Sequence, residues 1–227
     1  MRTLARLVAL TLLVVQLHAA EDSLPRGFVY LDAIIPTIRF DLRYYGSDNF
    51  VGERIDGYAA PKAILTKEAA EALRGVQEEL APFGLGLEVY DAYRPQRAVD
   101  HFVRWAKNVD DVKMKAKYYP DVDKRNLFKE SYIADKSSHS RGSTVDLTIA
   151  DLKEPKGAEL DMGGHFDLFG PPSWPDYTGI PASQRAHRLL LRQLMLEHGF
   201  APYPQEWWHF TLKNEPFPDT YFDFPVR

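Results

Sequence analysis

The 227-residue sequence contains no cysteine. Disulfides, a thiolate nucleophile, cysteine-based zinc sites and lipid attachment at a lipobox cysteine are therefore excluded. A chain without disulfides must be stabilised by its core, and 45% hydrophobic and 13% aromatic residues are enough to form one. Any bound metal ion has to be held by histidine, aspartate or glutamate.

The sequence also lacks a concentration of positive charge. It has 28 Lys and Arg against 32 Asp and Glu, a formal net charge of −4. A mildly acidic chain with no basic run is a poor candidate for nucleic-acid binding, so we expect no nucleic-acid partner. No internal repeat and no break in composition follows residue 20. One α+β domain is therefore predicted over residues 21–227.

Residues 1–20 differ in kind from the rest of the chain. Arg2 and Arg6 precede an apolar run over 7–17, and two alanines follow, which is the order of a secretory signal peptide. The run is short for a permanent membrane span. An uncleaved anchor stays an alternative, because a histidine occupies a position near the cleavage site where a small residue is preferred. We expect a periplasmic or secreted protein with no stable membrane insertion once the signal is removed.

Hydrophobic periodicity predicts the main elements. They are one or two short strands over 28–43, helices over 66–80, 95–107 and 183–199, and strands over 85–90 and 144–149. Thr66 and Ser183 are expected to cap the first and last helices. The polar segment 108–136 is either a lid over a site or a solvated excursion.

One stretch, residues 136–148, holds a histidine and an aspartate seven positions apart, His139 and Asp146, with Gly142 between them. Polar and apolar residues alternate over 144–149, as in a strand with one buried face, and Asp146 belongs to the polar face. A carboxylate in mid-strand is poor strand chemistry and needs compensation. The candidates are a metal ion shared with His139, or a hydrogen bond or salt bridge at a sheet edge.

A second motif, Glu206-Trp-Trp-His209, lies near the C-terminus. On an ideal strand Glu206 and His209 would point to opposite faces, so both reach one cavity only if the chain turns between them. Zinc hydrolases combine three protein ligands with a carboxylate that takes a proton from water. His139, Asp146 and His209 would be the ligands, and Glu206 the base. The alternative is a core strand with polar edges.

The motifs that follow are spread over the chain after residue 20. They are Ser-His-Ser-Arg-Gly-Ser-x-x-Asp-Leu-Thr, Glu-Trp-Trp-His, an early group (Asp41, Tyr44, Asp48, Asn49, Phe50), the Tyr93-Arg94-Pro95 turn and the closing segment 221–226. In this order they resemble the D-alanyl-D-alanine dipeptidases, the zinc enzymes of the vancomycin-resistance type in peptidase family M15, subfamily D. The resemblance implies an antiparallel central sheet flanked by helices, the fold shared with zinc D,D-carboxypeptidases and the hedgehog domain.

The same resemblance implies one Zn²⁺ per chain. Its ligands would be His139, Asp146 and His209, and the general base would be Glu206.

The remaining implied roles concern the substrate. Arg94 would stabilise the oxyanion, although the residues alone favour a simple ion pair with a carboxylate such as Asp91. Tyr44 and Asp167 would receive the free ammonium of a dipeptide. Ser137 would contact the dipeptide near its other end.

The implied activity is hydrolysis of the small D,D-dipeptide D-alanyl-D-alanine to two D-alanines in cell-wall turnover. The main enzymatic alternative is a D,D- or L,D-carboxypeptidase that trims peptidoglycan stem peptides, and Asp167 favours the dipeptidase. A non-enzymatic zinc-containing binding module is a third alternative, which the presence of Glu206 and Arg94 disfavours. An export signal suits recovery of D-alanine better than protection of a cytoplasmic precursor pool.

Overall fold

The computed structural model describes residues 24–153 and 158–227, so the predicted signal peptide over 1–20 lies outside the described residues. Strands are β1 (Phe28–Tyr30), β2 (Arg39–Phe40), β3 (Ile64–Thr66), β4 (Leu85–Asp91), β5 (Thr144–Asp151), β6 (Phe200–Tyr203) and β7 (Glu206–Leu212). Helices are α2 (Leu31–Ile34), α3 (Lys67–Leu80), α4 (Gln96–Lys107), α5 (Lys115–Tyr118) and α6 (Ala182–Glu197), with 3-10 turns at Ala81–Phe83, Lys124–Asn126, Ser138–Arg141 and Pro171–Ser173. None of the helices in these ranges is long and apolar enough to cross a membrane.

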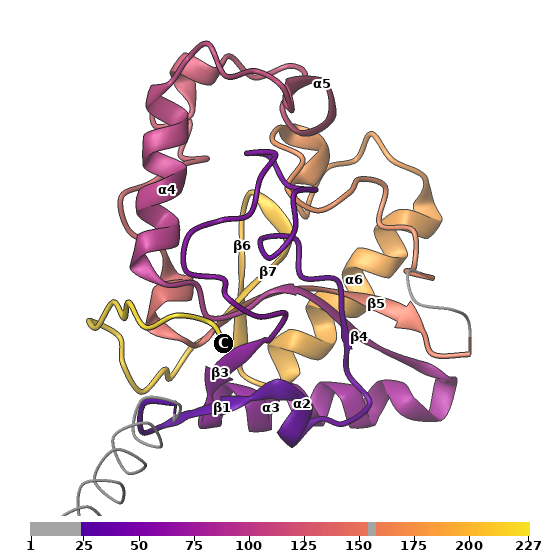
Figure 1. The fold of residues 1–227 in the computed structure, drawn as a ribbon. Coiled ribbons are helices and arrows are strands. Elements are labelled where there is room, and N and C mark those ends of the chain that lie inside the picture. The colour runs from indigo at the N-terminus through magenta and orange to yellow at the C-terminus, as the bar shows by residue number, and fades with distance from the viewer. Residues whose placement is uncertain (1–23, 154–157) are drawn as a thin grey trace, which may run out of the picture.

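The centre of the domain is a five-stranded sheet in the order β2-β4-β5-β7-β6, and β1 pairs with β3 in a separate two-stranded sheet. All neighbours in the larger sheet are antiparallel except β2 and β4 at one edge, which run parallel. Figure 1 shows α3 and α6 running along the sheet and α4 standing at its side. The predicted α+β domain with helices flanking a mainly antiparallel sheet is confirmed.

Strand β5 occupies the middle of the sheet, and this overturns one expectation. Its residues are buried from Thr144 to Ala150, on both faces, rather than on one apolar face. Thr144, for example, lies against β7, where its hydroxyl is 2.8 Å from that of Thr211. Of the three polar residues in this alternation, Asp146 lines the cavity of the candidate site, whereas Thr144 and Thr148 are buried and do not line it.

Two of the helix caps test the sequence rules directly. The Thr66 hydroxyl accepts a hydrogen bond from the Ala69 amide at 3.4 Å, which confirms the predicted cap of α3. Ser183 does not cap α6: the helix begins one residue earlier, and Pro181 stands at the N-cap position without a side-chain bond. Pro181 is held in an extended conformation (ψ 153°) that already directs the chain into the first turn.

The 108–136 insertion packs against the domain and is not a solvated excursion. Tyr118, Tyr119 and Leu127 have no exposed surface. Tyr132 stacks on Phe169, with ring centroids 4.9 Å apart and an interplanar angle of 6°. The insertion thereby reaches the segment between β5 and α6.

The C-terminal segment packs on the Tyr93-Arg94-Pro95 turn. Tyr93 stacks on Phe224 at 4.0 Å and donates a hydrogen bond to its carbonyl oxygen. Phe28 lies edge-on to Tyr93 and also covers Gly142, where a Cβ atom would come within 2.2 Å of the Phe28 ring. Because Gly142 also has a φ of +84°, only glycine suits this turn between the two halves of the His139–Asp146 motif.

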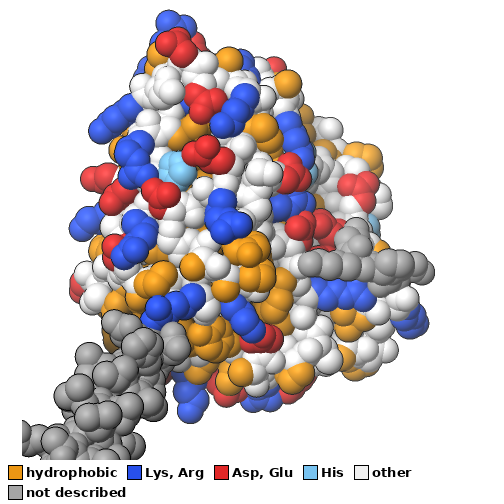
Figure 2. Space-filling view, viewed as in Figure 1, with side chains coloured by type: hydrophobic (Ala, Val, Ile, Leu, Met, Phe, Trp, Pro, Cys, Tyr) orange, Lys and Arg blue, Asp and Glu red, His pale blue; other side chains and the backbone are white. Residues whose placement is uncertain are grey.

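Basic and acidic side chains are interspersed on the face of the molecule shown in Figure 2. This mixed surface agrees with the small negative net charge of the sequence.

Candidate active site

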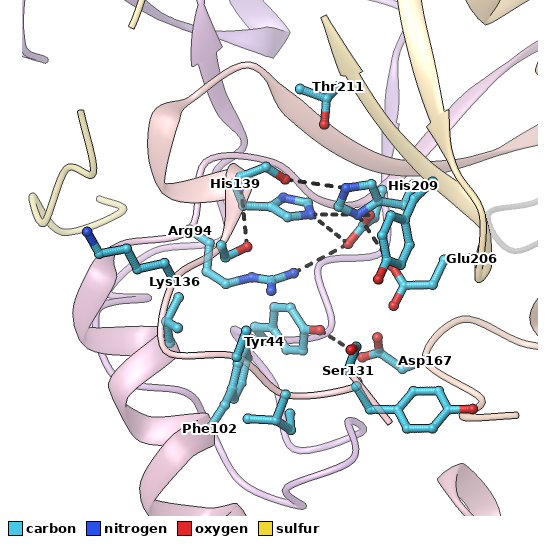
Figure 3. Close-up of a pocket in the computed structure, with 18 of the residues that line it drawn as sticks. Tyr44, Arg94, Phe102, Ser131, Lys136, His139, Asp167, Glu206, His209 and Thr211 are labelled. Carbon is cyan, nitrogen blue, oxygen red and sulfur yellow. Dashed lines mark hydrogen bonds and ion pairs between the residues drawn. The ribbon is translucent and has the colours of Figure 1, made fainter. Parts of the chain in front are cut away.

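Three elements bring His139, Asp146 and His209 together at the centre of the sheet. His139 lies in the 3-10 turn before β5, and Asp146 is the direct partner of His209 in the β5–β7 ladder. His139 Nε2 is 3.2 Å from Asp146 Oδ2 and 3.3 Å from His209 Nδ1, and His209 Nδ1 is 3.1 Å from Asp146 Oδ1. Figure 3 shows the two imidazole rings side by side, and they are nearly perpendicular, with an interplanar angle of 76°.

The surroundings orient His139 for metal binding. Its Nδ1 lies 2.7 Å from the Ala92 carbonyl oxygen, which can only accept, so the proton is on Nδ1 and the lone pair of Nε2 points at Asp146. Burial lowers the pKa of His139, which keeps the ring neutral. Metal-binding histidines are commonly fixed by such a bond from the other ring nitrogen.

The charges of Asp146 and His209 are complementary. Burial alone would raise the pKa of Asp146, but the hydrogen bond and charge of His209 hold it well below the ordinary value, so Asp146 is ionised. Burial alone would lower the pKa of His209, but the Asp146 carboxylate raises it.

The donor set fits a four-coordinate metal ion. Donors about 2.0–2.1 Å from a tetrahedral ion lie about 3.3 Å from one another, and the three distances here are 3.1 to 3.3 Å. Among residues 24–153 and 158–227, these three form the one group of His, Asp or Glu side chains close enough together to hold a metal ion. Two imidazole nitrogens and one carboxylate leave a fourth position free for water or substrate.

Glu206 lies beside this group, and β7 departs from regular strand pairing between Glu206 and Phe210, in line with the predicted break between Glu206 and His209. Glu206 and His209 belong to the same strand, and Glu206 Oε2 is 3.4 Å from His209 Nδ1. A turn precedes Glu206, and the β6–β7 register shifts where Pro202 pairs with Phe210 and Tyr203 with Glu206, so β7 is irregular between Glu206 and Phe210. Such an irregularity adds local twist, which re-aims the first residue of β7. Burial raises the pKa of Glu206 to about 7.

Arg94 forms the ion pair expected of it and also faces the site. Its Nε donates to Asp91 Oδ2 at 2.8 Å, and its Nη2 donates to Asp146 Oδ2 at 3.4 Å. The guanidinium lies 5.0 Å from the centre of the Tyr44 ring. Asp91 therefore anchors one edge of Arg94 and leaves the other edge toward the cavity.

Asp167 and Tyr44 lie on the other side of the cavity from His139 (Figure 3). The Tyr44 hydroxyl donates to Asp167 Oδ2 at 2.9 Å. Burial, and then the nearby Asp146 carboxylate, raise the pKa of Asp167 well above its usual range. Asp167 has a φ of +62°, a conformation that costs energy for a non-glycine residue. A buried carboxylate in this position is suited to a cationic ligand.

Ser137 also lines the cavity, and its hydroxyl accepts from the His139 amide at 3.3 Å. It therefore caps the turn that carries His139, in addition to any contact with a ligand.

Together these residues line a cavity of about 460 Å³, within the usual range for small-molecule sites. All eight residues predicted from the sequence belong to it: Tyr44, Arg94, Ser137, His139, Asp146, Asp167, Glu206 and His209.

Sequence reasoning missed several members of the site. Asp91 was considered only as a partner for Arg94, yet it also accepts from Tyr58 at 2.6 Å and lies 3.5 Å from His139 Nδ1. Ser138 was not singled out, although its hydroxyl is 3.4 Å from His209 Nε2. The position of Asp91 at the end of a buried strand was the available signal.

Comparison with known proteins gives a consistent result. The Peptidase M15 family profile described as D-ala-D-ala dipeptidase matches residues 25–227. The chain is 45% identical over 199 residues to a D-alanyl-D-alanine dipeptidase of Streptomyces coelicolor, and the match covers 88% of this chain and 98% of that protein. It is 44% identical over 200 residues to the D-alanyl-D-alanine dipeptidase of Enterococcus faecalis, with the same coverage.

More distant similarities extend to an Escherichia coli protein and a solved structure. The D-alanyl-D-alanine dipeptidase of Escherichia coli is 34% identical over 184 residues, covering 81% of this chain and 83% of that protein. The solved structure is that of the LdcB LD-carboxypeptidase, with 19% identity and a TM-score of 0.42, covering 86% of this chain and 72% of that one.

The buried charge of Asp167 predicts that Asp167→Asn stabilises the ligand-free protein. The folded-state pKa of Asp167 lies above its unfolded value of about 3.9, so the unfavourable contribution is absent at low pH and grows as pH rises toward the folded pKa. We expect a gain of about 1–3 kcal/mol at pH 7 and little gain near pH 4. Urea unfolding in the presence of a chelator measures the stability of the wild type and of Asp167→Asn at the two pH values. Equal stability of the two proteins at pH 7 would contradict a raised pKa for Asp167.

Proposed function

Because this chain belongs to the D-ala-D-ala dipeptidases of the Peptidase M15 family, we propose that it is a zinc peptidase that hydrolyses D-alanyl-D-alanine to two D-alanines. One observation carries this proposal. The metal-binding group and the buried Asp167 side chain line a single cavity, so a peptide bond can lie at one while a free ammonium is held at the other.

His139, Asp146 and His209 are the proposed zinc ligands, since two nitrogens and an oxygen with an open fourth position suit a catalytic zinc site. Zinc would supply Lewis acidity there, polarising a carbonyl group and making water nucleophilic near neutral pH.

Glu206 is the proposed general base. It is not one of the three ligands, and its carboxylate lies 3.4 Å from a ligand atom, His209 Nδ1. A pKa of about 7 lets it accept a proton from the attacking water and then return that proton to the leaving amine.

Arg94 is the proposed oxyanion donor. Asp91 holds it in place, and Nη2 remains directed toward the ligand group. A guanidinium already in position stabilises the charge that develops on the carbonyl oxygen without reorganising in the transition state.

Asp167 and Tyr44 are proposed to bind the substrate's ammonium, and Ser137 the end of the dipeptide nearer His139. A substrate cation would be a charged partner for the Asp167 carboxylate, and the Tyr44 hydroxyl fixes one oxygen of that carboxylate. The enzyme would then distinguish dipeptides from longer peptides by the presence of a free amino group at a fixed distance from the scissile bond.

Glu206→Gln and His209→Ala should separate catalysis from metal binding. We expect Glu206→Gln to retain about one zinc per chain and to lose turnover by about 10²–10⁴-fold. His209→Ala should lose both, since it removes a ligand. Elemental analysis and a D-alanine release assay measure the two properties, with Glu130→Gln, an exposed residue, as the control. An undiminished rate in Glu206→Gln would show that another group is the base.

Substrate length distinguishes the dipeptidase from a carboxypeptidase of stem peptides. We expect a higher kcat/KM for D-alanyl-D-alanine than for a pentapeptide stem, whose penultimate D-alanine has no free ammonium for Asp167. Phe169 and Tyr132, stacked across the wall of the cavity, support this restriction. Preferential trimming of the pentapeptide would favour the carboxypeptidase, and zinc binding without turnover of either would favour a binding module.

We further propose that the protein is exported and recovers D-alanine from peptidoglycan turnover. The proposal depends on residues 1–20, whose two arginines, apolar run and small residues are typical of a signal peptide. Cell fractionation should find the protein, shortened at its N-terminus, in the periplasm or medium. A full-length cytoplasmic protein would remove the basis for this role.

A further inference from the structure

The segment that carries Asp167 is fastened to helix α6 by one side chain. This segment, residues 162–174, is called the Asp167 loop here. Arg188 of α6 donates three hydrogen bonds to it: from Nε to the Met162 carbonyl at 2.6 Å, from Nη1 to the Trp174 carbonyl at 2.9 Å, and from Nη2 to the Pro172 carbonyl at 2.8 Å.

Arg188 is an unusual residue to find inside a protein. It is 3% exposed, and its hydrogen bonds go to three backbone carbonyls rather than to a carboxylate. Burial lowers its pKa to about 10. Burying a charge is costly, and the carboxylate of Asp161 offsets only part of that cost. The burial of Arg188 is therefore better explained by its hydrogen bonds to the Asp167 loop than by a contribution to the stability of the core.

The three carbonyl groups lie on both sides of Asp167 in the chain. Met162 precedes it, whereas Pro172 and Trp174 follow it, so one guanidinium closes the loop at its base. The planar fork of arginine can satisfy three carbonyls in fixed directions, which the ammonium of lysine cannot do in the same way.

The same guanidinium also lies 5.8 Å from the centre of the Trp207 ring. Trp207 follows Glu206 in β7, and two residues later comes His209. Arg188 thus contacts both the loop that carries Asp167 and the strand that carries the base and one metal-binding residue.

Asp167 itself needs such support. Its left-handed φ of +62° and its buried carboxylate both favour another conformation of the loop. A second hydrogen bond within the loop, from the Ser173 hydroxyl to the Leu168 carbonyl, braces the chain directly after Asp167.

We propose that Arg188 is a positioning residue for recognition of the substrate's amino end, because it fixes the Asp167 loop against β7 and so sets the distance from Asp167 to the metal-binding group. This rests on the proposed function, in which Asp167 receives the ammonium. Arg188 does not touch the substrate; it acts through the loop.

The test compares two substrates across matched variants. The substrates are D-alanyl-D-alanine and propanoyl-D-alanine, which has the same peptide bond but no ammonium. The variants are Arg188→Lys and Arg188→Met, with Arg185→Lys and Arg185→Met as controls. Arg185 lies on the same helix and is exposed.

We expect the preference for D-alanyl-D-alanine over propanoyl-D-alanine to fall about tenfold in Arg188→Met, because a displaced Asp167 loses a charge-assisted contact with the ammonium. Most of the change should be a rise in KM for D-alanyl-D-alanine. Arg188→Lys should retain part of the preference, and the Arg185 variants should keep all of it.

A purely structural role gives a different result, since a smaller folded fraction lowers the rates with both substrates equally and leaves their ratio unchanged. An unchanged ratio in Arg188→Lys, or in Arg188→Met where that variant folds, would overturn the proposal.

Hydrogen exchange provides a readout that does not need activity. Amides of residues 162–174 should exchange faster in Arg188→Lys than in Arg185→Lys, and equal protection would also overturn the proposal. Failure of the proposed function would be visible earlier and separately, as a wild-type protein that does not hydrolyse D-alanyl-D-alanine.

Discussion

Negative charge inside one cavity is the constraint on which the site depends. Asp91, Asp146 and Asp167 are nearly fully buried, and the Glu206 carboxylate lies next to them. Arg94 is the arginine that bonds two of these carboxylates, and neutral His139 adds no charge. Burial, and then repulsion from the Asp146 carboxylate, raise the pKa values of Asp167 and Glu206. The cavity is thus short of positive charge in two places, and a divalent metal ion and a substrate ammonium would supply it.

The sequence was informative wherever function requires particular residue types in a local pattern. His139 and Asp146 were recognisable because a carboxylate in mid-strand needs a partner, and Thr66 because helix capping is local chemistry. The central position of β5 could not be foreseen, since burial of its polar face depends on long-range partners such as Thr211. Asp91 was undervalued for the same reason, because its second partner, Tyr58, is 33 positions away.

The ends of the elements show where local sequence rules hold and where they fail. Ser183 was chosen as a cap from residue type alone, whereas the preceding Pro181 already sets the backbone for the first turn of α6. The position of Glu206 was predictable from strand geometry, because an ideal strand would point Glu206 and His209 to opposite faces, and β7 is irregular between Glu206 and Phe210. Arg188 gave no signal in the sequence, because its three partners are backbone carbonyls, which every residue offers equally.

The pairing of Asp146 with His209 across β5 and β7 has a consequence for folding fidelity. In a ladder with a two-residue side-chain period, a slip of one residue would send His209 to the opposite face of the sheet. A chain paired in the wrong register could still collapse, but it would have no complete set of three donors. Metal binding therefore depends on the correct alignment of β5 and β7, because only the native register brings Asp146 and His209 to the same face of the sheet.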